Sequence, residues 1–169
     1  MSILGCRFTF CTRKYFPAFF FSKSSAEISH LVKEFIDRSL ATMLYLPVAE
    51  HLFASQEQND IVLLLSSSPQ FLVAAIGEAL QIKFWQGTTY ECDKEGRFNK
   101  ISHIMEGEEK ARFVKKWMKQ LDIPLSSTII YSDSSLDLPL LKIAGKPIAV
   151  VPGFRFKRFC RRQGWEIMS

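Results

Sequence analysis

The feature of this sequence that most constrains its fold is an apolar run at residues 61–65, which is followed at once by three serines and a proline. A short run that is apolar at every position and bounded by polar residues is typical of a strand covered on both faces. Similar runs occur at residues 128–131 and 148–151, with helical patterns between them. Strands that alternate with helices predict an α/β fold of three αβα layers, with a mainly parallel sheet and right-handed crossovers.

Apolar spacing and turn residues predict the remaining elements of the chain. The first are helices over residues 26–46 and 47–54. A third helix, which Ser68 caps and Pro69 opens, runs through residue 80. These are followed by a hairpin or flap over 84–104, a helix over 108–121, a short helix over 136–144, a basic helix, and a last strand over 165–168. Pro47 separates the first two helices, because proline bends or restarts a helix.

Basic residues are concentrated near the two ends of the chain, and the formal net charge is +5. Five cations crowd residues 155–162, where a basic helix is predicted. A positive charge favours anionic partners but does not distinguish phosphate substrates, nucleic acid and acidic lipid. Two interpretations stay open for the basic helix: an ordinary solvated face, or contact with an anionic surface. We predict no specific nucleic-acid partner.

Several classes of protein are disfavoured by the sequence. The four cysteines form neither a CxxC pair nor a dense cluster, and the three histidines have no metal-site spacing, so neither a zinc site nor a disulfide framework is predicted. The aromatic segment at residues 8–21 is interrupted by charges and a proline, and it is shorter than the roughly 20 apolar residues that span a bilayer. We therefore predict reduced thiols, neither a signal peptide nor an anchor, and a cytoplasmic location.

Polar residues that directly follow strands are the candidate site, because open parallel sheets bind ligands at the carboxyl ends of their strands. Ser66 and Ser67 follow the first strand, where a hydroxyl and the amides of the next helix could hold a phosphate oxygen, although such a serine also caps helices. Asp133 and Asp137 follow the strand at 128–131. Two carboxylates on one loop suit Mg²⁺, although helix capping by Asp133 and a first-turn position for Asp137 explain them equally well.

Lys110 stands at the start of a predicted helix, in the sequence Gly-Glu-Glu-Lys. A positive charge there opposes the helix dipole, which favours a role for the ammonium group. An exposed lysine beside two glutamates is the ordinary alternative.

The sequence contains, in this order, a serine after a strand, a lysine that opens a helix, and a strand followed by SDSxxD. These features resemble the second, third and fourth motifs of the haloacid-dehalogenase-like hydrolase superfamily. The similarity is to its phosphoserine-phosphatase-like branch, subfamily IB. It covers about residues 27–169, including LLLSSSPQFL, GEEKARFV, YSDSSLDLPLL, KPIAVVP and GWEIM. The resemblance implies a Rossmann-like core over 57–169 and a partial helical cap over 26–56, preceded by an aromatic and basic segment over 1–25.

The resemblance also implies Mg²⁺-dependent hydrolysis of a phosphomonoester, with a phosphorylated small molecule as substrate. By this analogy Ser66 and Ser67 bind the transferring phosphoryl group, and Lys110 neutralises it. Asp133 ligates Mg²⁺ directly, and Asp137 orients Lys110 or a water bound to the metal, or is itself a ligand.

The superfamily's first motif, DxDxT, which supplies the aspartate nucleophile and the general acid, is absent from the sequence. Two histories stay open: a degenerate motif, with a short strand over residues 18–21 that puts Ser22 at the nucleophile position, or loss of the segment. Either removes the covalent route, because a serine without a neighbouring base cannot replace the carboxylate. We therefore predict a chain that is inactive or impaired by itself and that binds Mg²⁺ weakly.

The missing first motif also has a structural consequence, because its strand belongs between the strands at 61–65 and 128–131. Without it, both would present unpaired backbone groups. The competing interpretation is a non-enzymatic protein. It is either a subunit of a split enzyme, completed by a partner chain or a second copy, or a basic module that binds anionic surfaces.

Overall fold

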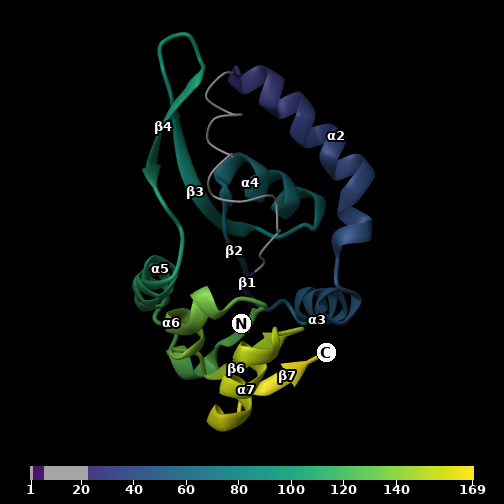
Figure 1. The fold of residues 1–169 in the computed structure, drawn as a ribbon, viewed down its shortest axis with the longest axis vertical. Helices are drawn as coiled ribbons and strands as arrows, with labels where there is room; N and C mark the ends of the chain where they lie inside the picture. The colour runs from purple at the N-terminus through teal and green to yellow at the C-terminus, as the bar shows by residue number, and fades with distance from the viewer. Residues whose placement is uncertain (1, 6–22) are drawn as a thin grey trace.

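The computed structural model describes residues 2–5 and 23–169 of the chain. Within these ranges the strands form one sheet, in the order β4-β3-β2-β1-β5-β6-β7 (Figure 1). They are β1 (Ser2–Gly5), β2 (Val62–Pro69), β3 (Phe84–Cys92), β4 (Phe98–His103), β5 (Ile129–Ser132), β6 (Lys146–Val150) and β7 (Glu166–Met168). All neighbours are parallel except β3 and β4, which form an antiparallel hairpin. The predicted mainly parallel sheet is confirmed.

Helices cover both faces of the sheet, so the predicted three layers are also confirmed. The helices are α2 (Ser25–Met43), α3 (Leu46–Glu57), α4 (Gln70–Ala79), α5 (Glu108–Gln120), α6 (Leu138–Leu141) and α7 (Phe154–Gln163), with short 3-10 turns η1 (Leu125–Ser127) and η2 (Ser135–Asp137). Leu63 and Leu65 of β2 pack with α5, α6 and α7, whereas Val62 and Leu64 pack with α2, α3 and α4. Successive side chains of a strand point to opposite faces, which is why this strand is apolar at every position.

The central position of the sheet is occupied by β1, which lies between β2 and β5 and is parallel to both. Ser2 pairs with Val62, and Gly5 pairs with both Leu65 and Ser132. Strand β1 thus takes the place that we predicted for residues 18–21, which themselves lie outside the described residues. The inner strands have the backbone partners that they require.

Helix α4 begins later than the sequence predicts. We expected Ser68 as its N-cap and Pro69 as its first residue, but β2 continues to Pro69 and α4 begins at Gln70. Pro69 pairs with Thr88 of β3, beyond an irregular stretch of β2. Gly87 permits this close approach, because a Cβ atom there would lie 2.8 Å from the carbonyl oxygen of Ser68.

The start of α2 contacts the tip of the β3–β4 hairpin. The Ser24 amide donates to Glu27 Oε2 at 2.9 Å, and the Glu27 amide donates to Ser24 Oγ at 3.2 Å, which is a capping box. The Ser25 amide donates to the carbonyl oxygen of Gly96 at 2.9 Å. Gly96 has a φ of +74°, a conformation that favours glycine, so the predicted turn is confirmed.

A small aromatic cluster joins α2, α4 and the hairpin. The Phe71 ring centroid lies 5.1 Å from that of Phe98 and 6.0 Å from that of Tyr90. Ile28 of α2 is buried in the same cluster. The division of the chain into a cap over 26–56 and a core over 57–169 stays a prediction.

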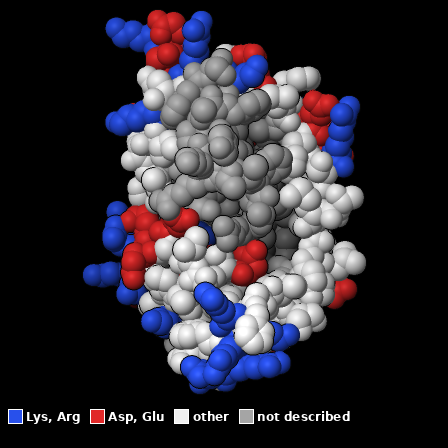
Figure 2. Space-filling view, viewed as in Figure 1, with Lys and Arg blue, Asp and Glu red and all other residues white. Residues whose placement is uncertain are grey.

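Charge is unevenly distributed over the surface. Lys and Arg side chains gather at the end of the molecule that α7 forms (Figures 1 and 2). None of the helices in residues 23–169 is both long enough and apolar enough to cross a membrane.

Candidate functional site

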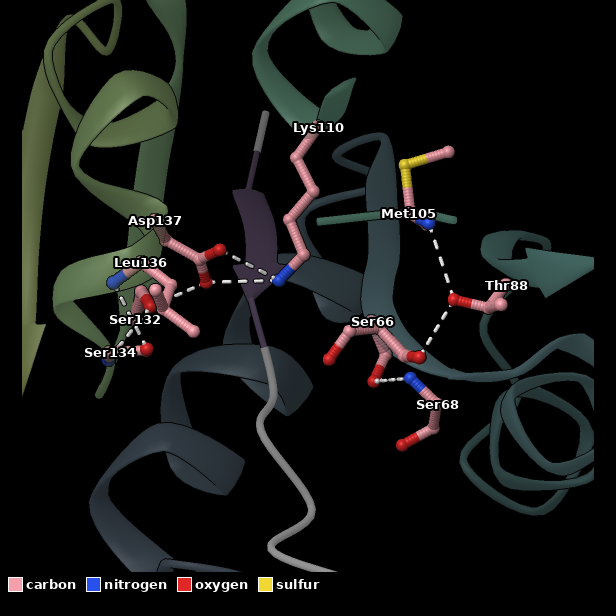
Figure 3. A network of polar contacts seen from close by, with 10 residues as sticks. Ser66, Ser68, Thr88, Met105, Lys110, Ser132, Ser134, Leu136 and Asp137 are labelled. Atoms are coloured by element: carbon pink, nitrogen blue, oxygen red, sulfur yellow. Dashed lines mark hydrogen bonds and ion pairs between the residues drawn. The ribbon is translucent and has the colours of Figure 1, made fainter. Parts of the chain in front are cut away.

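Polar side chains meet at the carboxyl ends of β2 and β5. Because Leu65 and Ser132 both pair with Gly5, the residues that follow them, Ser66 and Asp133, come after strand positions at the same level of the sheet. The Lys110 side chain reaches from α5 into the space between Ser66 and the loop after β5 (Figure 3).

Lys110 and Asp137 form a buried ion pair. Lys110 Nζ lies 2.9 Å from both Asp137 carboxylate oxygens, and the two side chains are 3% and 2% exposed. Ser132 Oγ donates to Asp137 Oδ2 at 2.7 Å (Figure 3). Taking both charges out of water carries a cost that their attraction often fails to repay, so stability alone is a weak reason for such a pair. A buried charged pair at the strand ends is a candidate for ligand binding.

The ordinary alternative for Lys110 does not fit the structure, whereas Asp137 lies in the first turn of η2 and also contacts Lys110. Lys110 is buried rather than exposed on the helix surface. Asp137 does precede α6 as its N-cap residue, but its side chain makes no capping hydrogen bond and turns to Lys110 instead. Ser134 caps the turn η2, which precedes α6, because Ser134 Oγ accepts a hydrogen bond from the Leu136 amide at 3.2 Å.

Ser66 is 1% exposed, and its Oγ accepts a hydrogen bond from the Ser68 amide at 3.2 Å. The neighbouring carbonyl oxygen of Ser67 accepts a hydrogen bond from Thr88 Oγ1 at 2.7 Å. Thr88 Oγ1 in turn accepts from the Met105 amide at 3.2 Å (Figure 3). The end of β2 is therefore fixed by β3 and by the segment that leads into α5.

Asp133 and Asp137 have different surroundings, although the sequence pairs them. Asp133 is exposed, whereas Asp137 is buried with both oxygens engaged by Lys110. Within the described residues, no group of three or more His, Cys, Asp or Glu side chains is placed to hold a metal ion. The role of Asp133 as a Mg²⁺ ligand stays a prediction, and Asp137 contacts Lys110.

Strand β1 ends between the two halves of this site. In the sequence, Cys6, Arg7 and Phe8 follow Gly5, and the first aspartate of the chain is Asp37. The position directly after β1 lies between the ends of β2 and β5, where a nucleophile would face a ligand. No carboxylate directly follows β1.

Sequence reasoning missed two members of the network, Ser132 and Thr88. Ser132 is one of five serines within residues 126–135 that resemble each other in the sequence, and Thr88 looks like any β-branched strand residue. Only their partners distinguish them, and those partners lie on other strands and helices.

Comparisons with known proteins point to one family. The family model of haloacid dehalogenase-like hydrolases matches residues 10–142 of the chain. The chain is 31% identical over 156 residues to the phosphoserine phosphatase SerB1 of Mycobacterium tuberculosis, covering 89% of this chain and 49% of that protein. It is 28% identical over 141 residues to the histidinol-phosphatase of Neisseria meningitidis serogroup C, covering 80% of this chain and 62% of that protein. The chain thus spans about half to three fifths of these relatives.

Solved structures have the same fold. A protein of unknown function from Bordetella pertussis Tohama I matches with a TM-score of 0.79 at 21% identity, covering 94% of this chain and 75% of that one. A phosphoserine phosphatase, in a phospho-aspartyl intermediate analogue, matches with a TM-score of 0.58 at 18% identity, covering 71% of this chain and 56% of that one. At these identities the likeness concerns the fold alone.

Proposed function

Because the chain belongs to the haloacid dehalogenase-like hydrolase family, we propose that it binds a phosphomonoester at the carboxyl ends of β2 and β5. The family resemblance is to phosphatases, and the proposed ligand is a phosphorylated small molecule. The relatives' names, phosphoserine phosphatase and histidinol-phosphatase, support this class of ligand without selecting a member of it.

The observation that carries the proposal is the buried Lys110–Asp137 pair. A lysine ammonium group has three N–H donors, and within the described residues Asp137 is its only partner. One hydrogen bond to Asp137 Oδ2 and an ion-pair contact to Oδ1 leave at least one N–H donor for a phosphoryl oxygen. Asp137 thus holds Lys110 in place as a positioning residue, and Lys110 supplies positive charge in a site from which water is largely excluded.

Ser66 supplies a second contact to the phosphoryl group. Its Oγ accepts a hydrogen bond from the Ser68 amide, and within residues 23–169 its hydroxyl hydrogen has no acceptor, so it can be donated to a phosphoryl oxygen. Ser67 is half-buried beside it and completes the proposed phosphate-binding set.

Proteins of this family generally use Mg²⁺, which supplies charge neutralisation at the phosphoryl group when it is bound. In this chain we propose that Asp133 holds the ion together with ligand oxygens and water, because Asp137 is already engaged by Lys110. A single protein carboxylate is at the lower limit for Mg²⁺, so we propose weak binding that depends on the phosphorylated ligand.

We propose that this chain by itself turns over its ligand slowly or not at all. Phosphoryl binding relies on positioning and charge, which the site retains, but the covalent route needs a carboxylate nucleophile. None directly follows β1 in the sequence. A partner chain or a second copy that supplies an aspartate beside the end of β1 is the alternative form of the proposal.

Two further features belong to the proposal. The free thiols of Cys92 and Cys160 fit a cytoplasmic location, where thiols are kept reduced. A second candidate role is contact with an anionic surface through α7, which the five cations of that helix favour.

Calorimetric titration with inorganic phosphate and with phosphoserine, with and without Mg²⁺, tests the proposal. We expect Ser66→Ala to weaken phosphate binding at least tenfold, because a hydrogen bond to a charged group contributes about 1.5–3 kcal/mol. The double variant Lys110→Met/Asp137→Leu should abolish binding while the chain stays folded. Lys115→Ala on the exposed surface of α5 is the control. Equal affinity for all four proteins would refute the proposed site.

A further inference from the structure

Helix α7 carries an unusual concentration of positive charge. Arg155, Lys157, Arg158, Arg161 and Arg162 give this ten-residue helix five cations and no anion. The chain has 22 Lys and Arg against 17 Asp and Glu, so the rest of the chain is formally neutral. Its whole net charge of +5 therefore resides on one helix.

These cations are not neutralised by the described part of the chain. No acidic residue occurs between Asp137 and Glu166. Glu166, the acidic residue that comes next in sequence after α7, pairs with Lys146 of β6 at 2.8 Å. Within residues 23–169, none of the five α7 cations forms an ion pair. The cluster thus repels itself and favours an external anion.

An apolar side chain projects from the same helix. Phe154, the first residue of α7, is 83% exposed, and Val151 in the preceding loop is 56% exposed. Phe154, Arg158 and Arg162 are spaced by four residues, so they lie on one face of the helix. The opposite face is anchored in the fold, where Phe156 and Cys160 are buried in the core.

A hollow of about 380 Å³ opens on this outer surface of α7. It is lined by Phe154, Arg155, Arg158, Phe159 and Arg162. The Phe159 ring is held by Trp165, with centroids 5.5 Å apart in an edge-to-face arrangement. Guanidinium groups bind phosphate oxygens in a fork geometry, while phenylalanine rings provide apolar contact.

We propose that α7 docks this protein on bilayers that contain anionic phospholipids. The cations face the lipid phosphates, and Phe154 and Val151 enter the boundary between headgroups and acyl chains. A lipid surface fits these features better than nucleic acid does, because Phe154 precedes the cluster as an exposed apolar tip. Val151 directly follows β6, so it lies at the same end of the sheet, the carboxyl ends of the parallel strands, as the candidate site. The inference does not depend on the proposed phosphoryl binding.

Sedimentation of the full chain with vesicles tests the proposal. Vesicles of phosphatidylcholine with 30% phosphatidylglycerol are compared with pure phosphatidylcholine, in about 0.1 M salt. We expect the chain to bind the anionic vesicles alone. This binding should weaken when the salt concentration is raised, because exposed charges are then screened.

Three variants identify the surface. Arg158→Glu/Arg162→Glu should weaken binding at least 20-fold, since each basic residue contributes about a fivefold gain at an anionic membrane. Phe154→Ser leaves the charge unchanged and should weaken binding several-fold. Lys115→Glu/Lys116→Glu makes the same change in charge on exposed α5 and should retain most of the binding. All these side chains are exposed, so each variant is expected to fold, which circular dichroism checks.

The proposal is overturned by any of three results: equal binding to neutral vesicles, an equal loss in the α5 control, or no effect of Phe154→Ser. A fourth measurement, competition by a single-stranded oligonucleotide, separates the two anionic partners. Tighter binding of the oligonucleotide that is insensitive to Phe154→Ser would likewise overturn the assignment to lipid.

Discussion

Lys110 and Asp137 are 27 residues apart in the chain, yet Lys110 Nζ lies 2.9 Å from each carboxylate oxygen of Asp137 in the interior of the protein. Each single replacement, Lys110→Met or Asp137→Leu, leaves the other charge buried without its partner. We expect each to lower the free energy of unfolding by about 3–5 kcal/mol.

The double variant Lys110→Met/Asp137→Leu should recover most of that stability, because no charge is then left in the core. Urea unfolding followed by circular dichroism measures all three proteins. If the double variant loses as much free energy of unfolding as the two single variants together, the two residues are not coupled.

A second prediction concerns catalysis. The purified chain should release no phenol from an aryl phosphate with Mg²⁺ above the uncatalysed background, because no carboxylate follows β1. Cys6→Asp/Phe8→Asp restores a D-x-D sequence directly after β1, and this variant should gain metal-dependent release. Asp133→Ala in that background should abolish the gain. Robust release by the unmodified chain, lost on Asp133→Ala, would mean that another residue is the nucleophile.

A third prediction concerns backbone strain beside the sheet edge. Val151 has a φ of +37°, which is unfavourable for a β-branched residue, and its side chain is mostly exposed. Val151→Gly should relieve the strain and raise stability by about 1 kcal/mol, equivalent to about 2–4 °C in the melting temperature. Val151→Ala keeps a Cβ atom and should gain less. An equal or lower melting temperature for the glycine variant would contradict the prediction.

A fourth prediction concerns acid stability. The Ser24 amide and hydroxyl hydrogen bonds, with Lys23 nearby, lower the pKa of Glu27 below its ordinary value. A lowered folded-state pKa contributes stability above the unfolded value, about 4.3, and that contribution is lost as the pH falls through the folded value.

Glu27→Gln keeps a hydrogen-bonding side chain in the capping box but removes the titrating group. The stability difference between the unmodified chain and this variant should therefore be present at pH 7 and shrink at pH 3. Urea unfolding at the two pH values measures it, and a difference that grows on acidification would be the wrong sign.

The layered architecture could be predicted because its strands are buried on both faces. Residues 61–65 are apolar at every position, and such a pattern has few alternatives whatever surrounds it. Strand β1 could not be predicted in the same way. Ser2–Gly5 is four residues long and begins with serine and ends with glycine, so it has little strand preference of its own. It is a strand because β2 and β5 offer hydrogen-bonding partners on both sides.

The candidate site, too, could be predicted from the sequence only in part. Lys110 stood out because its charge conflicts with an ordinary helix start, and Asp137 because it follows a strand on one loop with Asp133. Their contact with each other, and the part of Ser132 in it, depend on how α5 and β5 come together, which no local pattern encodes. The late start of α4 was missed for a similar reason: Gly87, 19 residues after Ser68, lets β2 run on.

The central place of β1 has a consequence for how the chain folds during synthesis. Ser2 leaves the ribosome well before its partners, Val62 and Ile129. The middle of the sheet therefore closes only after β5 has been made. Pairing over such separations makes folding slow and leaves apolar strand edges exposed in the meantime. A nascent chain stalled before β5 emerges should be a substrate for chaperones, whereas the released full chain should not.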